Sequence, residues 1–153
     1  METLIVYKSV FHGNTKKIAI AMAEVLNAKF LDVENVDKKI IGDYDLIGFG
    51  SGIYYDKPQK KLMEYIEGLN NVKNKKAFVF STSRQNRSDY NDWFKENLSD
   101  KGFEIIGEFH CKGHTIFKGN PNEEDLENAK EVARNIINTY NQILDMPEDS
   151  TNI

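Results

Sequence analysis

A short segment near the N-terminus has the residue types that bind a phosphate group. It runs from Ser9 to Thr15, directly after an apolar run, and its side chains include two hydroxyls and one amide. Such side chains donate hydrogen bonds, glycine lets a backbone approach closely, and N–H groups at a helix start attract anions. We therefore interpret the segment as a phosphate-binding loop. Its candidate residues are Ser9, Phe11, His12, Gly13, Asn14 and Thr15.

An ordinary helix cap is the alternative interpretation of this segment. In that case Asn14 or Thr15 is the N-cap, and Gly13 only forms a turn. The segment contains no Lys or Arg, although Lys16 and Lys17 follow it. Dipoles would therefore provide most of the compensation for a phosphate charge. The residues alone leave both interpretations open.

Three residues further along the chain, His110, Cys111 and His114, suggest a metal site or a Cys–His nucleophile. Neighbours in a strand point to opposite faces, so His110 and Cys111 do not easily share one ion. No second cluster in the sequence supplies the remaining ligands, and nothing orients a nucleophile pair. We therefore expect no metal site and no catalytic side chain, and we expect Cys111 to be a small semi-buried residue.

The elements that position these residues follow from alternating strand-length and helix-length apolar patterns. We expect the third strand to run into a glycine-rich turn that contains Gly50 and Gly52. Five strands are predicted, over residues 4–7, 29–33, 46–49, 77–80 and 103–109. Helices are predicted from about Thr15, from near Pro58, from about Ser88, and from about Asn122, the expected N-cap, to Leu144.

Strands separated by helices imply a parallel sheet covered on both faces, because parallel neighbours need crossover connections. The fold class is thus α/β with a doubly wound, five-stranded parallel sheet. In such a sheet a ligand lies at the carboxyl ends of the strands. This rule directs attention to residues 8–15, 50–57, 81–88 and 110–119.

Length and composition exclude several classes of protein. The 153 residues suit one domain, which we place at residues 1–144, with a frayed tail over 145–153. No apolar run approaches the roughly 18 residues of a membrane span, and one cysteine fits a reducing compartment. The N-terminus lacks the pattern of a signal peptide. The single cysteine and these missing patterns lead us to expect a cytoplasmic protein. A net charge of −4 argues weakly against nucleic acid as the main partner.

The chain resembles the flavodoxins. The resemblance rests on a strand ending in Tyr7, the Ser9–Thr15 loop and an alanine-containing helix, and extends over about residues 2–144 through DLIGFGSGIYYDKPQ and AFVFSTS. It is similar to small flavodoxins that lack the long insertion in the last strand. The resemblance implies strand order 2-1-3-4-5 in a three-layer sandwich, noncovalent FMN and one-electron transfer. The chain departs from the common family loop by one additional residue between Ser9 and Gly13.

The resemblance also places the flavin ring between two loops. In the first, Tyr54 or Tyr55 can stack on the ring, and the Gly52 carbonyl can turn towards N5 when the flavin is reduced. The alternative is a turn with two interfacial tyrosines. In the second loop, backbone or hydroxyl groups of Thr82 and Ser83 can bond the pyrimidine edge of the flavin. The cation of Arg84 would favour the anionic reduced flavin if it reaches that edge. The alternative is a solvated polar loop. The candidate ring-binding residues are Ser51, Gly52, Ile53, Tyr54, Tyr55, Thr82, Ser83 and Arg84.

The favoured function is an FMN-containing electron carrier that shuttles low-potential electrons between redox partner proteins. We expect a monomer with no membrane or nucleic-acid partner, and a carrier rather than an enzyme. The alternative is an FMN-dependent oxidoreductase acting on a quinone or a similar small acceptor. A third possibility is a scaffold that has lost FMN, against which the intact loop from Ser9 to Thr15 argues.

The charge is unevenly distributed around the predicted flavin site. Residues 54–61, 84–92 and 111–119 carry +2, 0 and +2, so the rim is +4 and the remainder is −8. Many flavodoxins have an acidic rim. We therefore expect a less negative second reduction potential, and partners with acidic or mixed docking faces.

Overall fold

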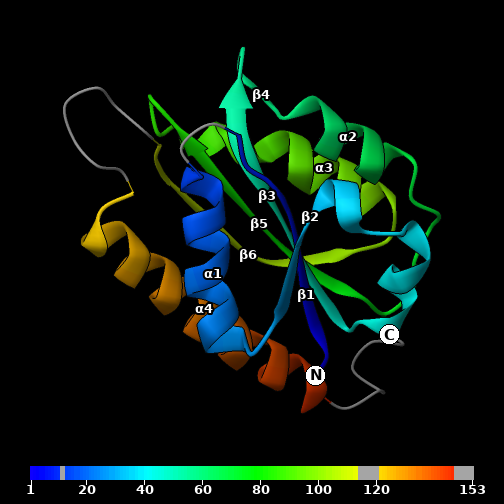
Figure 1. Ribbon diagram of the computed structural model, residues 1–153. Helices are drawn as coiled ribbons and strands as arrows, with labels where there is room; N and C mark the ends of the chain where they lie inside the picture. Colours follow the sequence, from blue (N-terminus) through cyan, green and yellow to red (C-terminus); the bar gives the residue numbers. More distant parts are fainter. Residues whose placement is uncertain (11–12, 114–120, 147–153) are drawn as a thin grey trace.

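A computed structural model describes residues 1–10, 13–113 and 121–146, and it contains the expected parallel sheet. Five strands lie in the order β2-β1-β3-β5-β6, which corresponds to the predicted order 2-1-3-4-5 (Figure 1). A further short strand, β4 (Lys57–Pro58), pairs antiparallel with β3. The five parallel strands are β1 (Thr3–Lys8), β2 (Lys29–Asp32), β3 (Leu46–Tyr54), β5 (Lys76–Ser83) and β6 (Glu104–Lys112). The predicted fold class is confirmed.

Helices cover both faces of the sheet, so the described residues form three layers (Figure 1). On one face, α1 (Asn14–Leu26) and α4 (Glu123–Leu144) pack on the phenylalanines of β5. On the other face, α2 (Lys60–Glu67) and α3 (Asp92–Asp100) pack on Phe49 and Val79. The described residues also form three short 3₁₀ helices: η1 (Val33–Asn35), η2 (Lys38–Asp43) and η3 (Ser88–Asn91).

The third strand is longer than its glycine content suggests. The expected turn at Gly50 and Gly52 is wrong, because β3 continues to Tyr54 and the turn falls at Tyr55 and Asp56. The reason is packing between strands. Gly48 and Gly50 lie opposite Phe78 and Phe80 in the sheet, and a Cβ at either glycine would come within 2.2 Å of the facing ring. These glycines therefore provide space for aromatic rings.

The predicted helix starts lie within two residues of the observed starts of α1, α2, η3 and α4. Asn122 caps α4 as predicted, in a reciprocal capping box with Asp125. Pro58 does not begin α2. It lies in β4, while the side chain of Gln59 caps the helix. The tail prediction falls largely on residues 147–153, which lie outside the described residues.

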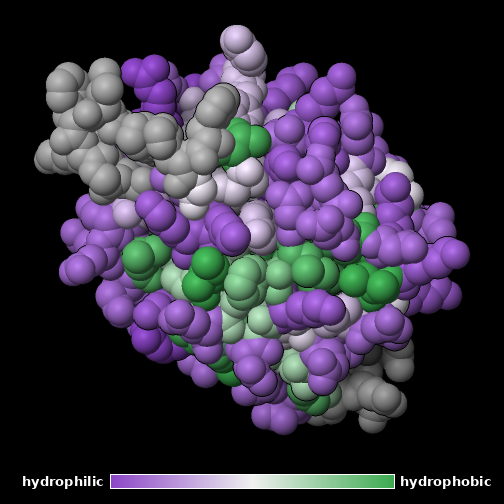
Figure 2. All heavy atoms as spheres, in the orientation of Figure 1, coloured by the Kyte–Doolittle hydropathy of each residue, from purple (hydrophilic) through white to green (hydrophobic). Residues whose placement is uncertain are grey.

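The surface of the molecule is mostly hydrophilic in the view of Figure 2, with a band of apolar side chains across the α1–α4 side. A shallow groove lies between the two helices, lined by Ile20 and Ala21 of α1 and by Leu126 of α4. Among the helices of the described residues, none combines the length and hydropathy that a bilayer-spanning segment needs.

Candidate functional site

The carboxyl ends of β1, β3, β5 and β6 surround an open cavity of about 370 Å³. The position agrees with the rule for doubly wound sheets. All four segments predicted at the carboxyl ends of the strands contribute to its walls. The lining residues are Val10, Asn14, Thr15, Gly52, Ile53, Tyr54, Thr82, Ser83, Arg84 and Gly113.

The start of α1 forms the end of the cavity next to β1. Gly13 is the N-cap and has a left-handed backbone (φ 69°), which glycine adopts without strain. Neither Asn14 nor Thr15 is the N-cap, so that part of the capping alternative is wrong. The first turn of α1 contains no acidic side chain, which leaves the positive end of the helix dipole available to an anion.

Ser9, another candidate residue of this loop, does not line the cavity. Ser9 lies beside the first turn of α1, where its Oγ accepts a hydrogen bond of 3.2 Å from the backbone N–H of Lys16. Phe11 and His12 lie outside the described residues.

Two buried hydroxyls connect the first turn of α1 to the end of β5. The Oγ1 atoms of Thr15 and Thr82 lie 2.9 Å apart, and the two residues are only 2% and 5% exposed. One hydroxyl donates to the other, so the donating proton of the second is available to a further acceptor. Thr15 and Thr82 are thus one polar unit shared by α1 and β5.

Tyr54 and Gly52 form the wall on the β3 side. A Cβ at Gly52 would lie 2.9 Å from the Tyr54 Oη, so the phenol folds back over the glycine. Burial raises the pKa of Tyr54, so this ring is a neutral, flat surface at ordinary pH. Ser51 precedes them, but its side chain turns towards α2 and does not line the cavity.

Tyr55 has a different position from Tyr54. It forms the two-residue tip of a hairpin with Asp56, and both have positive φ (52° and 65°), as a type I′ turn requires. The Tyr55 side chain is fully exposed and does not line the main cavity. Of the two candidate stacking residues, only Tyr54 therefore lies in its wall.

A second cavity of about 480 Å³ adjoins the first, and Ile53, Ser83 and Arg84 line both. In its wall the Tyr90 hydroxyl lies 3.1 Å from an Asp56 carboxylate oxygen and 2.8 Å from the Gln85 side-chain oxygen. Desolvation and the charge of Asp56 raise the pKa of Tyr90, which keeps the phenol protonated.

The loop after β5 is shaped by Ser83. Its Oγ accepts a hydrogen bond of 2.8 Å from the Asn86 N–H, and its carbonyl accepts one of 2.9 Å from the Gly113 N–H. Arg84 is exposed between the two cavities. Gly113 lines the cavity although it is not among the predicted site residues, because β6 extends to Lys112 and does not end at Phe109. The rule about carboxyl ends had nevertheless indicated residues 110–119.

The cysteine and histidines do not form a cluster within the described residues, where no group of three metal-ligating side chains occurs. Cys111 is buried. Desolvation of the thiol is the main cause that raises its pKa to about 12, and the negative charge of Asp125 adds to the effect. The neighbouring His110 is partly buried and pairs through Nδ1 with the Asn86 side chain at 2.6 Å. His114 lies outside the described residues.

Comparison with known proteins gives consistent matches over most of the chain. A protein-family model described as "Flavodoxin domain" matches residues 4–151. An uncharacterized protein of Methanocaldococcus jannaschii is 42% identical, over 90% of this chain and 99% of that protein. The structure is similar to flavodoxin 2 of Bacillus cereus (TM-score 0.75, 21% identity, 90% and 99% of the two chains). It is also similar to the Fusobacterium nucleatum flavodoxin bound to flavin mononucleotide (TM-score 0.66, 14% identity, 93% and 99%).

Proposed function

The chain belongs to the flavodoxin domain family, and from this premise we propose that it is an FMN-containing electron-transfer protein serving redox partner proteins. The observation that carries the proposal is the single cavity in which the start of α1, the end of β3 and the end of β5 meet. These are the three parts that a flavin mononucleotide needs: an anion site, a polar passage and a flat wall.

The chemistry of the lining residues fits FMN. The unopposed dipole of α1 and the backbone around Gly13 suit a phosphate, which carries the largest charge of the ligand. The hydroxyl pair of Thr15 and Thr82 suits the polar ribityl chain that follows. Tyr54 provides an aromatic wall for the ring, and stacking contributes about 0.5–1.5 kcal/mol beyond the burial of area.

FMN, when bound, supplies one- and two-electron redox chemistry, and the chain controls its binding and environment. Tyr54 and Ile53 exclude water from one side of the ring position. Ser83 and Gly113 hold the facing loop through the hydrogen bond between their backbones. Arg84 brings a positive charge to the edge shared by both cavities. In this proposal these residues determine how tightly the chain binds FMN at each of its oxidation levels.

Partner proteins would approach the positively charged surface beside the cavity. Lys57 at the hairpin and Lys112 at the end of β6 are exposed, as is Arg84. Lys61 contributes less than its formal charge, because it pairs with Glu34, and Lys118 lies outside the described residues. We propose partners with acidic or mixed docking faces, whose electron-transfer rate falls as ionic strength rises.

A visible spectrum of the purified protein, followed by FMN titration of the apoprotein, tests the proposed function. We expect a yellow protein that binds FMN more tightly than riboflavin, because riboflavin lacks the phosphate. Gly13→Ala should weaken FMN binding more than riboflavin binding, since alanine is strained at the left-handed backbone of the phosphate site. A colourless protein that cannot be reconstituted with FMN would refute the proposal.

The second cavity favours one alternative, an FMN-dependent oxidoreductase acting on a quinone or a similar small acceptor. It adjoins the proposed ring position and has polar groups from Asp56, Gln85 and Tyr90. Steady-state reduction of a soluble quinone by the FMN-loaded protein distinguishes the two functions. Saturable turnover that Tyr90→Phe lowers, with FMN affinity unchanged, supports the enzyme. A rate that rises linearly with quinone and is unaffected by this substitution supports the carrier.

A further inference from the structure

A cavity of about 410 Å³ at the amino end of the sheet has strongly basic walls. It is formed by the segments that precede β3 and β5, whereas the candidate functional site lies after the ends of these strands. Strands of eight and nine residues place the two cavities roughly 25 Å apart. Among the residues that the structure describes, four lysines and no acidic residue line this basic cavity. The lysines are Lys38, Lys39, Lys73 and Lys75.

Two of these ammonium groups are held in place by uncharged partners. The Lys75 Nζ donates hydrogen bonds of 3.0 Å and 2.6 Å to the carbonyl oxygens of Gly42 and Tyr44. An ammonium has three donors, so one remains for a ligand. The Lys38 Nζ lies 5.4 Å from the centre of the Tyr65 ring, in a cation–π contact. Both ammonium groups are thus positioned without being neutralised.

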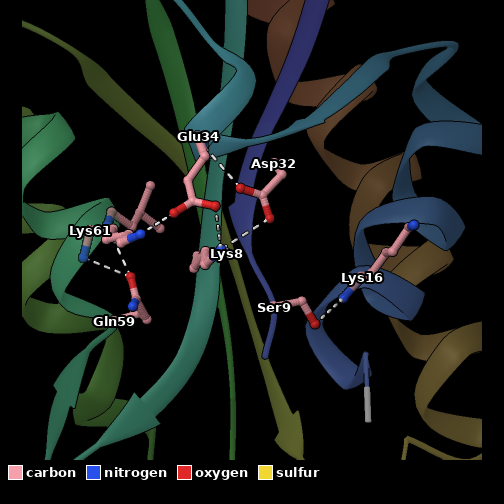
Figure 3. A network of polar contacts seen from close by, with 8 residues as sticks. Lys8, Ser9, Lys16, Asp32, Glu34, Gln59 and Lys61 are labelled. Atoms are coloured by element: carbon pink, nitrogen blue, oxygen red, sulfur yellow. Dashed lines mark hydrogen bonds and ion pairs between the residues drawn. The ribbon is translucent and has the colours of Figure 1, made fainter. Parts of the chain in front are cut away.

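Several other lysines of the chain pair with carboxylates. Lys61 pairs with Glu34, which also binds Lys8 at the end of β1, and Lys8 lies 3.5 Å from Asp32 at the end of β2 (Figure 3). These four residues form an ion-pair network. By contrast, no carboxylate of residues 1–10, 13–113 and 121–146 forms an ion pair with a lysine of the basic cavity.

The neighbouring charged residues leave the basic cavity positive. Asp37 caps η2, where its carboxylate accepts a hydrogen bond of 2.9 Å from the Lys39 N–H, and neither Asp37 nor Asp43 lines the cavity. Lys101 adds a positive charge beside it, since its ammonium donates to the carbonyl oxygen of Leu69, a lining residue. Ammonium groups gathered without counter-ions repel one another and attract anions.

We propose that the basic cavity binds a small oligophosphate anion, either an inorganic one or the phosphate chain of a nucleotide. Lysines bind phosphates as point charges, and the Asn70 and Asn71 side chains add amide donors. A concave site suits a small ligand, and four ammonium groups on two segments suit one with several negative charges. Within the described residues no aromatic ring lines the cavity, so a nucleobase finds no stacking partner and the phosphate chain is the part recognised.

Calorimetric titration of the FMN-loaded protein with tripolyphosphate tests the proposal, because bound FMN keeps this probe away from the start of α1. We expect saturable one-to-one binding. Backbone amide resonances of Gly42, Gly68 and Asn71 should shift in N–H correlation spectra. Combining Lys39→Gln with Lys73→Gln should weaken binding about four- to 25-fold, which is about two- to fivefold for each ammonium removed.

Lys29→Gln combined with Lys60→Gln is the matched control. It removes the same charge from two exposed residues that do not line the basic cavity, and the dissociation constant should change by less than about twofold. A parallel titration with ATP identifies the source of the phosphate chain. ATP binding tighter than that of tripolyphosphate would indicate a nucleotide, and equal or weaker binding an inorganic oligophosphate.

Three results would overturn the proposal. The first is the absence of saturable binding, and the second is equal weakening in the two double variants, which would show unspecific attraction by net charge. The third is tighter binding of hexaglutamate than of tripolyphosphate, which would show that the surface docks an acidic protein segment.

The basic cavity does not depend on the proposed function. A protein that binds no FMN refutes that function, while the same titration of the apoprotein still tests the basic cavity, because amide shifts locate the probe. Shifts at Gly42 and Gly68 would support the proposal. Shifts confined to Asn14 and Thr15 would overturn it, since tripolyphosphate would then bind only at the start of α1.

Discussion

The Oγ1 atom of Thr15, in the first turn of α1, lies 2.9 Å from the Oγ1 atom of Thr82, near the end of β5. Both residues are buried, and 67 positions separate them in the sequence. One end of the cavity is therefore connected to the other by a direct hydrogen bond. A phosphate bound at α1 and a ring bound beside β5 would each influence this pair.

We predict that Thr15→Val and Thr82→Val weaken FMN binding in a non-additive way. Valine keeps the shape and removes the hydroxyl, so each substitution breaks the same hydrogen bond. We expect each single variant to raise the dissociation constant about two- to tenfold, and the double variant to lose less than the product. Quenching of flavin fluorescence measures all four proteins. Strictly multiplicative effects would show that the hydroxyls act independently.

We predict that Gly50→Ala lowers the free energy of unfolding by about 1–3 kcal/mol, because its Cβ would overlap the Phe80 ring. Phe80→Leu in the same chain should recover part of the loss. Gly42→Ala is the control, since no heavy atom lies within 4 Å of a Cβ there, and it should change the stability by less than about 0.5 kcal/mol. Urea denaturation followed by circular dichroism gives these values. Equal losses at Gly42 and Gly50 would contradict the packing argument.

We predict that Arg84→Ala makes the second reduction potential of bound FMN more negative. The second electron adds negative charge, which Arg84 stabilises from the edge of the cavity. Because Arg84 is exposed, we expect about a two- to tenfold loss of relative affinity, or about 18–59 mV. Lys73→Ala serves as the control, because Lys73 precedes the start of β5, whereas Arg84 follows the end of that strand. An unchanged potential in Arg84→Ala would show that this side chain does not act on the flavin.

We predict that Glu34 contributes to the loss of stability in acid. Hydrogen bonds from Lys61 and Lys8 hold the pKa of Glu34 below 4.5, its ordinary value. The folded state therefore binds this proton less readily than the unfolded state, so the stabilisation is present above about pH 4.5 and disappears as the pH falls further. In Glu34→Gln the free energy of unfolding should change less steeply below that pH.

Urea denaturation at a series of pH values measures the effect. Glu67→Gln, at the exposed end of α2, is the matched control and should follow the wild-type curve. At the alkaline end, burial lowers the pKa of Lys8, but the bond to Glu34 and the charges of Asp32 and Glu34 raise it overall. The network should therefore remain intact until the pH exceeds the ordinary value of 10.5. A Glu34→Gln curve parallel to wild type in acid would exclude this role.

Local patterns predicted much of the fold. Alternating apolar runs predicted the parallel sheet, and the resemblance to the flavodoxins implied its strand order. Asn122 with Asp125 marked the start of α4. Features that depend on distant packing were not predicted. The end of β3 was placed too early, because the rings of Phe78 and Phe80 occupy the space above Gly48 and Gly50.

In the candidate site, too, local sequence patterns were predictive, whereas features that depend on contacts between distant residues were not predicted. The sequence indicated the four segments that line the cavity, and the structure brings them together. It did not distinguish the two tyrosines, because the turn at Tyr55 and Asp56 depends on the pairing of β3 with β4. The hydrogen bond between Ser51 and the Gln59 N–H was not predicted, since it depends on the approach of Gln59 to the end of β3.

The alternation of glycine and phenylalanine between β3 and β5 also has a consequence for folding. Each ring of Phe78 and Phe80 faces a glycine, so the two strands fit together in one alignment. A slip by one residue would place Phe78 opposite Ile47 or Phe49, and it would turn every side chain of the moved strand to the other face. These glycines therefore select the correct strand pairing at the centre of the sheet, where pairing errors would misplace the two loops that line the cavity after β3 and β5.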